Sequence, residues 1–188
     1  HQRSENHFVF TVTIDVASVE YADAVRLAGH SCSTVASAYW LGVRALRALY
    51  GDAMPQRGDI AVDLREPYEA GTTGVVASVL GLLTGAAGDG GFAGLGGQFV
   101  RRGLLQFNAP IETELRFTRT DTGQAVLAQG RAHSVPGDPQ TMRLMQMCLV
   151  GMASEEQHAE FGRLWQDRVQ RILLDHAFDD AVFEIRAA

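Results

Sequence analysis

The clearest helical pattern of apolar residues in the chain runs over residues 32–50. Apolar side chains recur there every three or four positions, at Val35, Tyr39, Val43, Leu46 and Tyr50. This period places them on one face of an α-helix, so the pattern predicts an amphipathic helix that packs on a core. Gly51 and Asp52 follow directly and are expected to end the helix.

Other segments follow either the alternation of a strand or the period of a helix. Strands are predicted over residues 7–16, 59–65, 98–108, 112–120, 124–133 and 181–187. Helices are predicted over 19–27 with Ser18 as N-cap, over 72–83 and 141–153, and from the capping signal at Ser154 to about residue 175. Seven glycines within residues 85–97 predict a loop of tight turns. The sequence therefore predicts one α+β domain over residues 1–188.

Composition limits the classes of partner. The chain is 46% hydrophobic and 20% charged, which is typical of a soluble globular domain, and its formal net charge is −6. No basic stretch reaches five residues, so neither nucleic acid nor a membrane is expected as a partner. The longest apolar run, residues 74–87, is shorter than the ~18 residues that span a bilayer.

All 16 basic residues are arginine. The absence of lysine excludes a P-loop lysine, a Schiff base with pyridoxal phosphate and a lysine general base. The two cysteines, Cys32 and Cys148, lie far apart and form no disulfide framework. We expect two independent thiols in a reducing compartment and hence a cytoplasmic protein, with export left open because the chain starts at His1 and not at Met.

The main chemical candidate is the run Gly29-His30-Ser31-Cys32. It places an imidazole and a thiol two positions apart, directly before the predicted helix, where the helix dipole favours a thiolate. One hypothesis is a transition-metal site held by His30 and Cys32, because zinc, iron and copper accept both donors and zinc is the ion expected first. Two ligands are too few, so His133 is the expected third ligand, and further candidates are His7, Glu66, Glu69 and Cys148.

Two alternatives to a metal site stay open for this run. Cys32 is also a candidate catalytic nucleophile, with His30 or His133 as its base and helix N-terminal amides as oxyanion donors. In the third interpretation Cys32 is a buried apolar residue and His30 only a hydrogen-bond donor near the helix start.

A methionine-rich helix and the glycine loop suggest a binding module. Met145, Cys148 and Met152 share one helix face, and such sulfur ligands suit Cu(I) or the edge of a haem. Core packing or a homodimer interface gives the same pattern. The cluster around Gly91 is a poor dinucleotide fingerprint and better fits close backbone approach to another segment or to a ligand. A non-catalytic dimer that binds haem or another small molecule is therefore an alternative function.

The residues from His30 to Cys32, followed by a helix with Tyr39 and Gly42, resemble the FmdE-like family, which takes its name from one of the subunits of formylmethanofuran dehydrogenase. A similar element is Leu83-Thr84-Gly85 with the glycine loop through Gly91. A weaker similarity is Arg102-Gly103 with the apolar residues that follow. The resemblance covers residues 19–108.

The resemblance implies a mixed β-sheet packed by helices, often in a homodimer, and a metal or metal cofactor with a redox or accessory enzyme role. It carries His30 and Cys32 over as metal-site residues and Thr84 and Gly85 as loop positions. The expected cofactor-binding positions are Thr84, Gly85, Gly91 and Met145. The chain departs from the family pattern at Ala28, where the family has its first histidine, and near Val75 and Ala86, where it has cysteines.

Overall fold

The structure is a computed structural model that describes residues 7–12 and 15–188, with side chains described from Ser18 onward. Its elements in chain order are β1 (His7–Val12), β2 (Asp15–Glu20), α1 (Tyr21–Ala28), α2 (Ser33–Tyr50), β3 (Ile60–Leu64), α3 (Thr73–Thr84), β4 (Leu105–Gln106), β5 (Leu115–Arg119), β6 (Ala125–Gly130), a 3₁₀ turn η1 (Ala132–Ser134), α4 (Gln140–Leu149), α5 (Glu155–Leu174) and β7 (Phe183–Ala187). This is the α+β fold that the sequence predicts.

The main sheet is mixed and has the strand order β4-β3-β5-β6-β7. β3 pairs in parallel with the short β4 and antiparallel with β5, and the remaining pairs are antiparallel. On β3 the alternate residues Ile60, Val62 and Leu64 are buried, which is the period-two pattern of a strand with one face on a core. β1 and β2 form a separate antiparallel hairpin.

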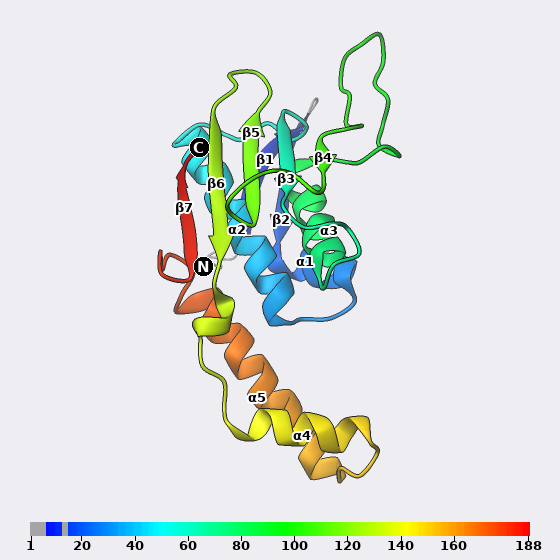
Figure 1. The fold of residues 1–188 in the computed structure, drawn as a ribbon, viewed down its shortest axis with the longest axis vertical. Coiled ribbons are helices and arrows are strands. Elements are labelled where there is room, and N and C mark those ends of the chain that lie inside the picture. Colours follow the sequence, from blue (N-terminus) through cyan, green and yellow to red (C-terminus); the bar gives the residue numbers. More distant parts are fainter. Residues whose placement is uncertain (1–6, 13–14) are drawn as a thin grey trace.

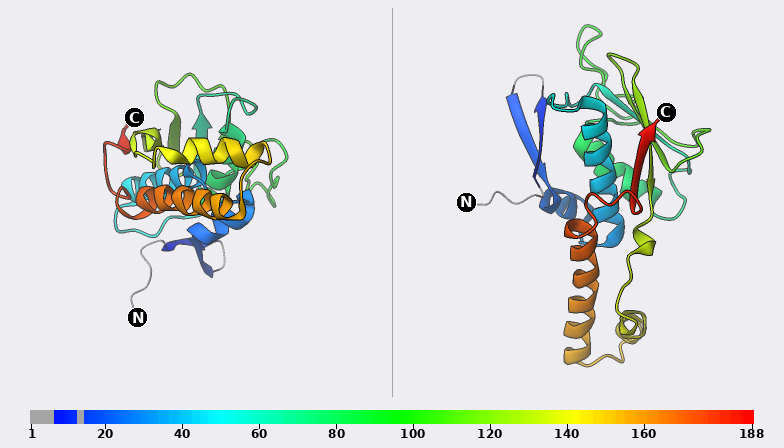
Figure 2. Two further views of the ribbon diagram at one scale, coloured as in Figure 1. Left: turned by 90° about the horizontal axis from the view of Figure 1, so that it is seen from below. Right: turned by 90° about the vertical axis from the view of Figure 1, so that its left-hand side faces the viewer.

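Helix α2 is the centre of the molecule. It lies between the β1–β2 hairpin and the main sheet, with α3 beside it (Figure 2). Tyr39 and Trp40 are almost fully buried, and the indole Nε1 of Trp40 donates a hydrogen bond of 3.0 Å to the carbonyl of Leu173 at the end of α5. The phenol of Tyr39 donates to the carbonyl of Val19 at 3.1 Å. α2 is thus bonded to elements from both ends of the chain.

Helices α4 and α5 form a hairpin that projects from the sheet (Figure 1). The C-terminal half of α5 belongs to the core through Val169, Ile172 and Leu173, whereas α4 buries only Leu144. Met142, Leu149, Val150 and Met152 of this projecting hairpin are more than half exposed. The methionine-rich helix is therefore not core packing over most of its length.

Several predicted elements are confirmed with small shifts at their ends. The helices predicted at 32–50, 72–83, 141–153 and 154–175 are α2, α3, α4 and α5. Ser154 caps α5 as expected, because its hydroxyl accepts from the N–H of Gln157 at 3.2 Å and its own N–H donates to the Gln157 side chain at 2.9 Å. Within the part of the chain that the structure describes, no helix is long and apolar enough to cross a membrane.

The predictions for the N-terminal segment are wrong in two respects. The single strand predicted over residues 7–16 is two strands, β1 and β2, and the residues that join them at 13–14 lie outside the described part. Ser18 is not an N-cap, because it lies inside β2 opposite Val9. α1 begins two residues after the predicted start, with Glu20 as its N-cap, whose N–H donates to the carboxylate of Asp23 at 2.9 Å.

Two predicted strands are shorter than expected. Of the segment 98–108, only Leu105 and Gln106 pair as a strand. Backbone turns interrupt the rest, since Phe99 and Gly103 have φ angles of 61° and 75°, which no extended strand adopts. β6 ends at Gly130, so His133 lies on η1 and not at the end of a strand.

Candidate functional site

The predicted pair His30 and Cys32 lies in the loop between α1 and α2. Cys32 is the N-cap residue of α2 and its side chain is buried, at 7% exposure. The His30 side chain is exposed, and its Nδ1 lies 3.3 Å from the carbonyl oxygen of Ala28. The two side chains therefore differ in their access to solvent, although they are two positions apart.

Three side chains hold Ser31, the residue between His30 and Cys32, in place. The hydroxyl of Tyr21 and that of Ser31 are hydrogen bonded at 3.0 Å. The carbonyl oxygen of Ser31 accepts from the indole of Trp165 and from the amide of Gln166, both at 3.1 Å. Burial raises the pKa of the Tyr21 phenol, which lies close to Cys32. The loop is thus held by α1 on one side and by α5 on the other.

The fit of a metal ion to these residues depends on where the other possible ligands lie. Among residues with described side chains, no group of three or more His, Cys, Asp or Glu is arranged to hold a metal ion. Glu66 pairs with Arg65 at 3.0 Å, and Cys148 is half-buried on α4. The side chain of His7 lies outside the described part. The metal site at His30 and Cys32 therefore stays a prediction.

The expected cofactor positions on the glycine loop have structural roles in this fold. Thr84 is fully buried, and its hydroxyl donates to the Leu80 carbonyl at 2.7 Å and accepts from the N–H of Ala86 at 3.1 Å. Gly85 ends α3 with a φ of 74°. A Cβ on Gly91 would lie 2.9 Å from the N atom of Arg102, so Gly91 permits the close backbone approach that the sequence suggests.

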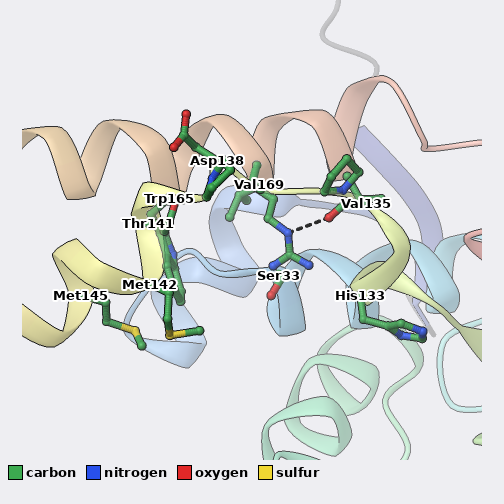
Figure 3. Close-up of a pocket in the computed structure, with 13 residues that line it drawn as sticks. Ser33, His133, Val135, Asp138, Thr141, Met142, Met145, Trp165 and Val169 are labelled. Carbon is green, nitrogen blue, oxygen red and sulfur yellow. Dashed lines mark hydrogen bonds between the residues drawn. The ribbon is translucent and has the colours of Figure 1, made fainter.

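The largely apolar hollow beside the start of α2 holds two of the predicted residues, Met145 and His133. It has a volume of about 320 Å³ and we call it the apolar chamber. It is lined by Ser33, His133, Val135, Pro136, Gly137, Asp138, Pro139, Thr141, Met142, Met145, Trp165, Arg168 and Val169. Figure 3 shows Met142, Met145 and Trp165 at one end of this chamber and His133 at the other.

A second hollow, of about 370 Å³, adjoins the first, and we call it the polar chamber. Ser33, His133 and Arg168 line both chambers. The polar chamber adds Thr34, Ser37, Ala38, Thr72, Val76, Glu114, Gly130 and Ala132. Neither Cys32 nor His30 is among the residues that line the two chambers. We call the two chambers together the cleft.

Arg168 of α5 holds the wall between the chambers. Its Nε donates to the carbonyl of Val135 and its Nη2 to the carbonyl of Ala132, both at 2.9 Å. These two bonds tie the η1 turn that carries His133 to α5, and the dashed line in Figure 3 marks the one to Val135. The planar guanidinium suits this task, because it presents several donors in a fixed geometry.

Glu114 is the acid of the polar chamber. It precedes β5, and its Oε2 accepts a hydrogen bond of 3.2 Å from the N–H of Gly130 at the end of β6. Burial raises the pKa of this carboxyl, and the hydrogen bond from Gly130 opposes the rise only in part. A Cβ on Gly130 would lie 3.0 Å from the hydroxyl oxygen of Ser37 and 3.3 Å from Oε2 of Glu114, so the glycine lets both α2 and Glu114 pack closely on the end of β6.

The start of α2 adds a positive potential to the cleft. Cys32 gives the helix no side-chain cap, and the first N–H that bonds within the helix here is that of Ala36, to the Cys32 carbonyl at 3.0 Å. The amides of the first turn, including that of Ser33, point out of the helix end. A hydrogen-bond acceptor on a ligand is favoured at this end of the cleft.

Sequence reasoning found His133 and Met145 but missed Ser33, Glu114 and Arg168. Glu114 and Arg168 belong to a predicted strand and a predicted helix in which charged residues are ordinary, so no local signal marks them. Ser33 follows Cys32 directly, and its position at a helix start was the one usable signal.

Comparison with known proteins adds no assignment. No protein-family model matches the chain, and no curated protein matches it in sequence.

Proposed function

We propose that this chain binds a small organic molecule in the cleft. The observation that carries the proposal is the junction of an apolar and a polar chamber through Ser33, His133 and Arg168. Ligand sites in proteins have volumes of this order and combine apolar walls with a few converging polar groups. An apolar ligand body would contact Met142, Met145 and Trp165, and its polar end would face Ser33, His133 and Glu114.

The polar end group expected is one that accepts hydrogen bonds. The open amides at the start of α2 and the hydroxyls of Ser33 and Ser37 are donors. Glu114, with its raised pKa, retains a proton to higher pH than an ordinary carboxyl and can then donate as well. A carbonyl, hydroxyl or sulfonate group meets these requirements.

The proposal is tested with 8-anilinonaphthalene-1-sulfonate, which has an apolar body and an oxygen-rich end. We expect saturable binding of one dye per chain, seen as dye fluorescence and as quenching of Trp165, which lines the apolar chamber. Met145→Gln should weaken the affinity several-fold, because it places an amide in the apolar wall.

Met147→Gln is the matched control for that variant. Met147 lies on the same helix and is half-buried like Met145, but it lines a different hollow with Glu156 and Glu160. The dye affinity of this variant should equal that of the unmodified protein. Equal losses in both variants, or binding that never saturates, would place the dye on the exposed residues of the projecting hairpin and contradict the proposal.

A metal-dependent role for His30 and Cys32 is the second proposal. It is favoured by the position of Cys32 as the N-cap residue of α2, two positions after His30, so that two side chains of metal-ligating types lie in one short loop. The remaining ligands would have to come from water, a bound molecule or residues beyond those with described side chains. Its test compares the metal content of Cys32→Ser with that of Cys148→Ser.

A further inference from the structure

A third hollow lies at the opposite end of the main sheet from the cleft. Glu114 directly precedes β5, whereas Thr120 follows this strand and lines the third hollow, which has a volume of about 520 Å³. Its lining is Gln56, Arg57, Gly58, Asp59, Phe99, Val100, Arg101, Leu104 and Thr120. Two arginines therefore meet in one hollow, and Asp59 is the one acid among the described residues of its lining.

The Nη1 atom of Arg101 is buried and lies against two glycines. A Cβ would lie 2.0 Å from this atom if placed on Gly58 and 2.2 Å if placed on Gly85. Both glycines have positive φ angles, of 102° and 74°, so residue type and backbone conformation agree in leaving this space to the arginine. Gly58 and Gly85 thus leave the space that the Arg101 side chain occupies.

Nη1 of Arg101 is buried and has no hydrogen-bond partner among the described residues. In particular it does not donate to Asp59, the acid of the lining. A buried donor of a charged group that lacks a partner is costly, because the group has lost its hydration without replacement. Such groups in folded proteins are ordinarily satisfied by a bound ion, ligand or water.

Arg57 adds a second cation to the same hollow. Its Nε and Nη2 point to the carbonyls of Leu82 and Gly81 at the C-terminal end of α3, at 3.2 and 3.4 Å. Burial lowers the pKa of Arg57, and the nearby charge of Arg101 lowers it further. The carbonyls hold Arg57 beside Arg101, so the repulsion between the two cations is built into the fold.

We propose that Arg57 and Arg101 bind the phosphoryl group of a small molecule. Two guanidinium groups match the charge of a phosphate dianion, and the unpaired Nη1 of Arg101 is a donor for its oxygens. The hydroxyl of Thr120 lies in the same hollow. At a net charge of −6 the chain as a whole repels anions, so binding requires a local site of this kind.

The rim of the hollow suggests that the phosphate carries an organic group. Phe99 and Val100 are 47% and 39% exposed and lie beside the arginines. Phe99 adopts a φ of 61°, which a bulky residue rarely takes. An aromatic or apolar substituent on the phosphate would contact these side chains, whereas inorganic phosphate would not reach them.

Thermal unfolding in phosphate and in sodium chloride of equal ionic strength tests the site. We expect phosphate to raise the melting temperature by about 3–6 °C when its concentration is roughly ten times the dissociation constant. Arg101→Gln should abolish this rise. Arg102→Gln, which removes the exposed neighbouring arginine, is the matched control and should retain it. A rise that survives in Arg101→Gln, or no phosphate-specific rise in the unmodified protein, would overturn the proposal.

Two further measurements are needed. One tests the site if Arg101→Gln does not fold, and the other distinguishes free phosphate from an organic phosphate. Arg101→Lys keeps a cation but loses the planar donors, so phosphate affinity by ³¹P NMR titration should fall about tenfold. If Arg101→Gln does not fold, unchanged affinity in Arg101→Lys overturns the proposal. Phenyl phosphate should bind more tightly than inorganic phosphate, and Phe99→Ala should remove that difference alone. Equal affinities would assign the site to free phosphate and contradict a role for the rim.

Discussion

The indole Nε1 of Trp165 donates a hydrogen bond of 3.1 Å to the carbonyl oxygen of Ser31, and so ties α5 to the loop in front of α2. The same indole lines the apolar chamber, and Ser31 lies between the two residues predicted as a metal pair. One side chain therefore connects the cleft with the His30–Cys32 loop. A substitution of Trp165 should therefore affect both the cleft and the His30–Cys32 loop.

Trp165→Phe should lower the free energy of unfolding by about 1 kcal/mol, because the aromatic body is kept and one hydrogen bond is lost. Gln166→Ala removes the second bond to the same carbonyl, but from an exposed side chain, and should cost less. Urea unfolding measures both. Losses near zero in both variants would show that α5 does not hold the loop.

Looser attachment of the loop should also expose Cys32. In the unmodified protein Cys148 is half-buried and Cys32 buried, so Cys148 should react first with iodoacetamide. The double variant Trp165→Phe, Gln166→Ala should raise the alkylation rate of Cys32 several-fold and leave that of Cys148 unchanged. Mass spectrometry of the labelled peptides separates the two cysteines. Rapid alkylation of Cys32 in the unmodified protein would instead favour the thiol-enzyme hypothesis.

Glu114 should make stability fall as pH rises. Its folded-state pKa is raised by burial, so between the ordinary carboxyl pKa and the raised value the folded protein binds more protons than the unfolded chain. The free energy of unfolding then decreases with pH through that window. Glu114→Gln should remove this dependence, and it should therefore gain stability relative to the unmodified protein at pH 7 but not at pH 4.

Glu112→Gln is the control for Glu114→Gln. Glu112 lies two positions away, is exposed and pairs with Arg186. Its loss should cost less than about 1 kcal/mol and bring no gain at pH 7. Urea unfolding of all three proteins at pH 4 and pH 7 gives the comparison. A gain at pH 7 in the control as well would assign the effect to net charge and not to the burial of Glu114.

The contact between α2 and α3 depends on Gly42. A Cβ at this position would lie 2.5 Å from Cδ1 of Leu83 and 3.1 Å from Cδ2 of Leu80, both in the core. Gly42→Ala should therefore cost about 1–3 kcal/mol through overpacking. Gly162→Ala is the opposite case, because Gly162 lies on α5 and no atom of the described residues lies within 4 Å of its Cβ position.

Alanine has the higher helix propensity, so Gly162→Ala should gain about 0.5–1 kcal/mol. Opposite signs for the two glycine substitutions are expected in urea unfolding. A loss in both would mean that α5 needs its glycine for a reason other than space. A gain in both would mean that the α2–α3 contact is loose enough to admit a methyl group.

The helices were predictable because their signals are local. Ser154 and Gln157 form the capping box of α5 within four residues, and the apolar period of α2 fixes its buried face. The segment 98–108 was not predictable in this way. Its composition favours a strand, but turns at Phe99 and Gly103 leave only Leu105 and Gln106 beside β3. The pairing of an edge strand depends on a partner that is distant in the sequence.

The cleft shows the same limit for function. His133 was predicted as a site residue because it is a histidine just before a break rich in proline and glycine, where site residues are common. Glu114 gains its raised pKa only from burial beside Gly130, sixteen residues further on, and Arg168 gains its role from carbonyls more than thirty residues earlier. Neither relation has a signature in the local sequence. Conversely, the spacing of His30 and Cys32 suggested one site, but their side chains differ in burial.

We expect a metal ion bound through Cys32. Elemental analysis of the untagged protein should find about one metal ion per chain, with zinc first among the expected ions. Cys32→Ser should lose most of this metal, because the hydroxyl of serine is a far weaker ligand than a thiolate. Cys148→Ser is the matched control, since it removes the other cysteine, which is half-buried on α4, and it should retain the metal.

The visible spectrum of the same samples separates the alternatives. A haem would give strong absorption that Cys32→Ser changes, whereas zinc gives none. Metal content that is equal in all three proteins would place the ion away from Cys32, and no metal in any of them would leave the His30–Cys32 loop without a metal role. In that case Cys32 is best explained as a buried residue at the start of α2. The loop before it is held in place by Tyr21, Trp165 and Gln166, which bond to Ser31. The cleft would then be the site to pursue, because its proposal does not depend on metal at Cys32.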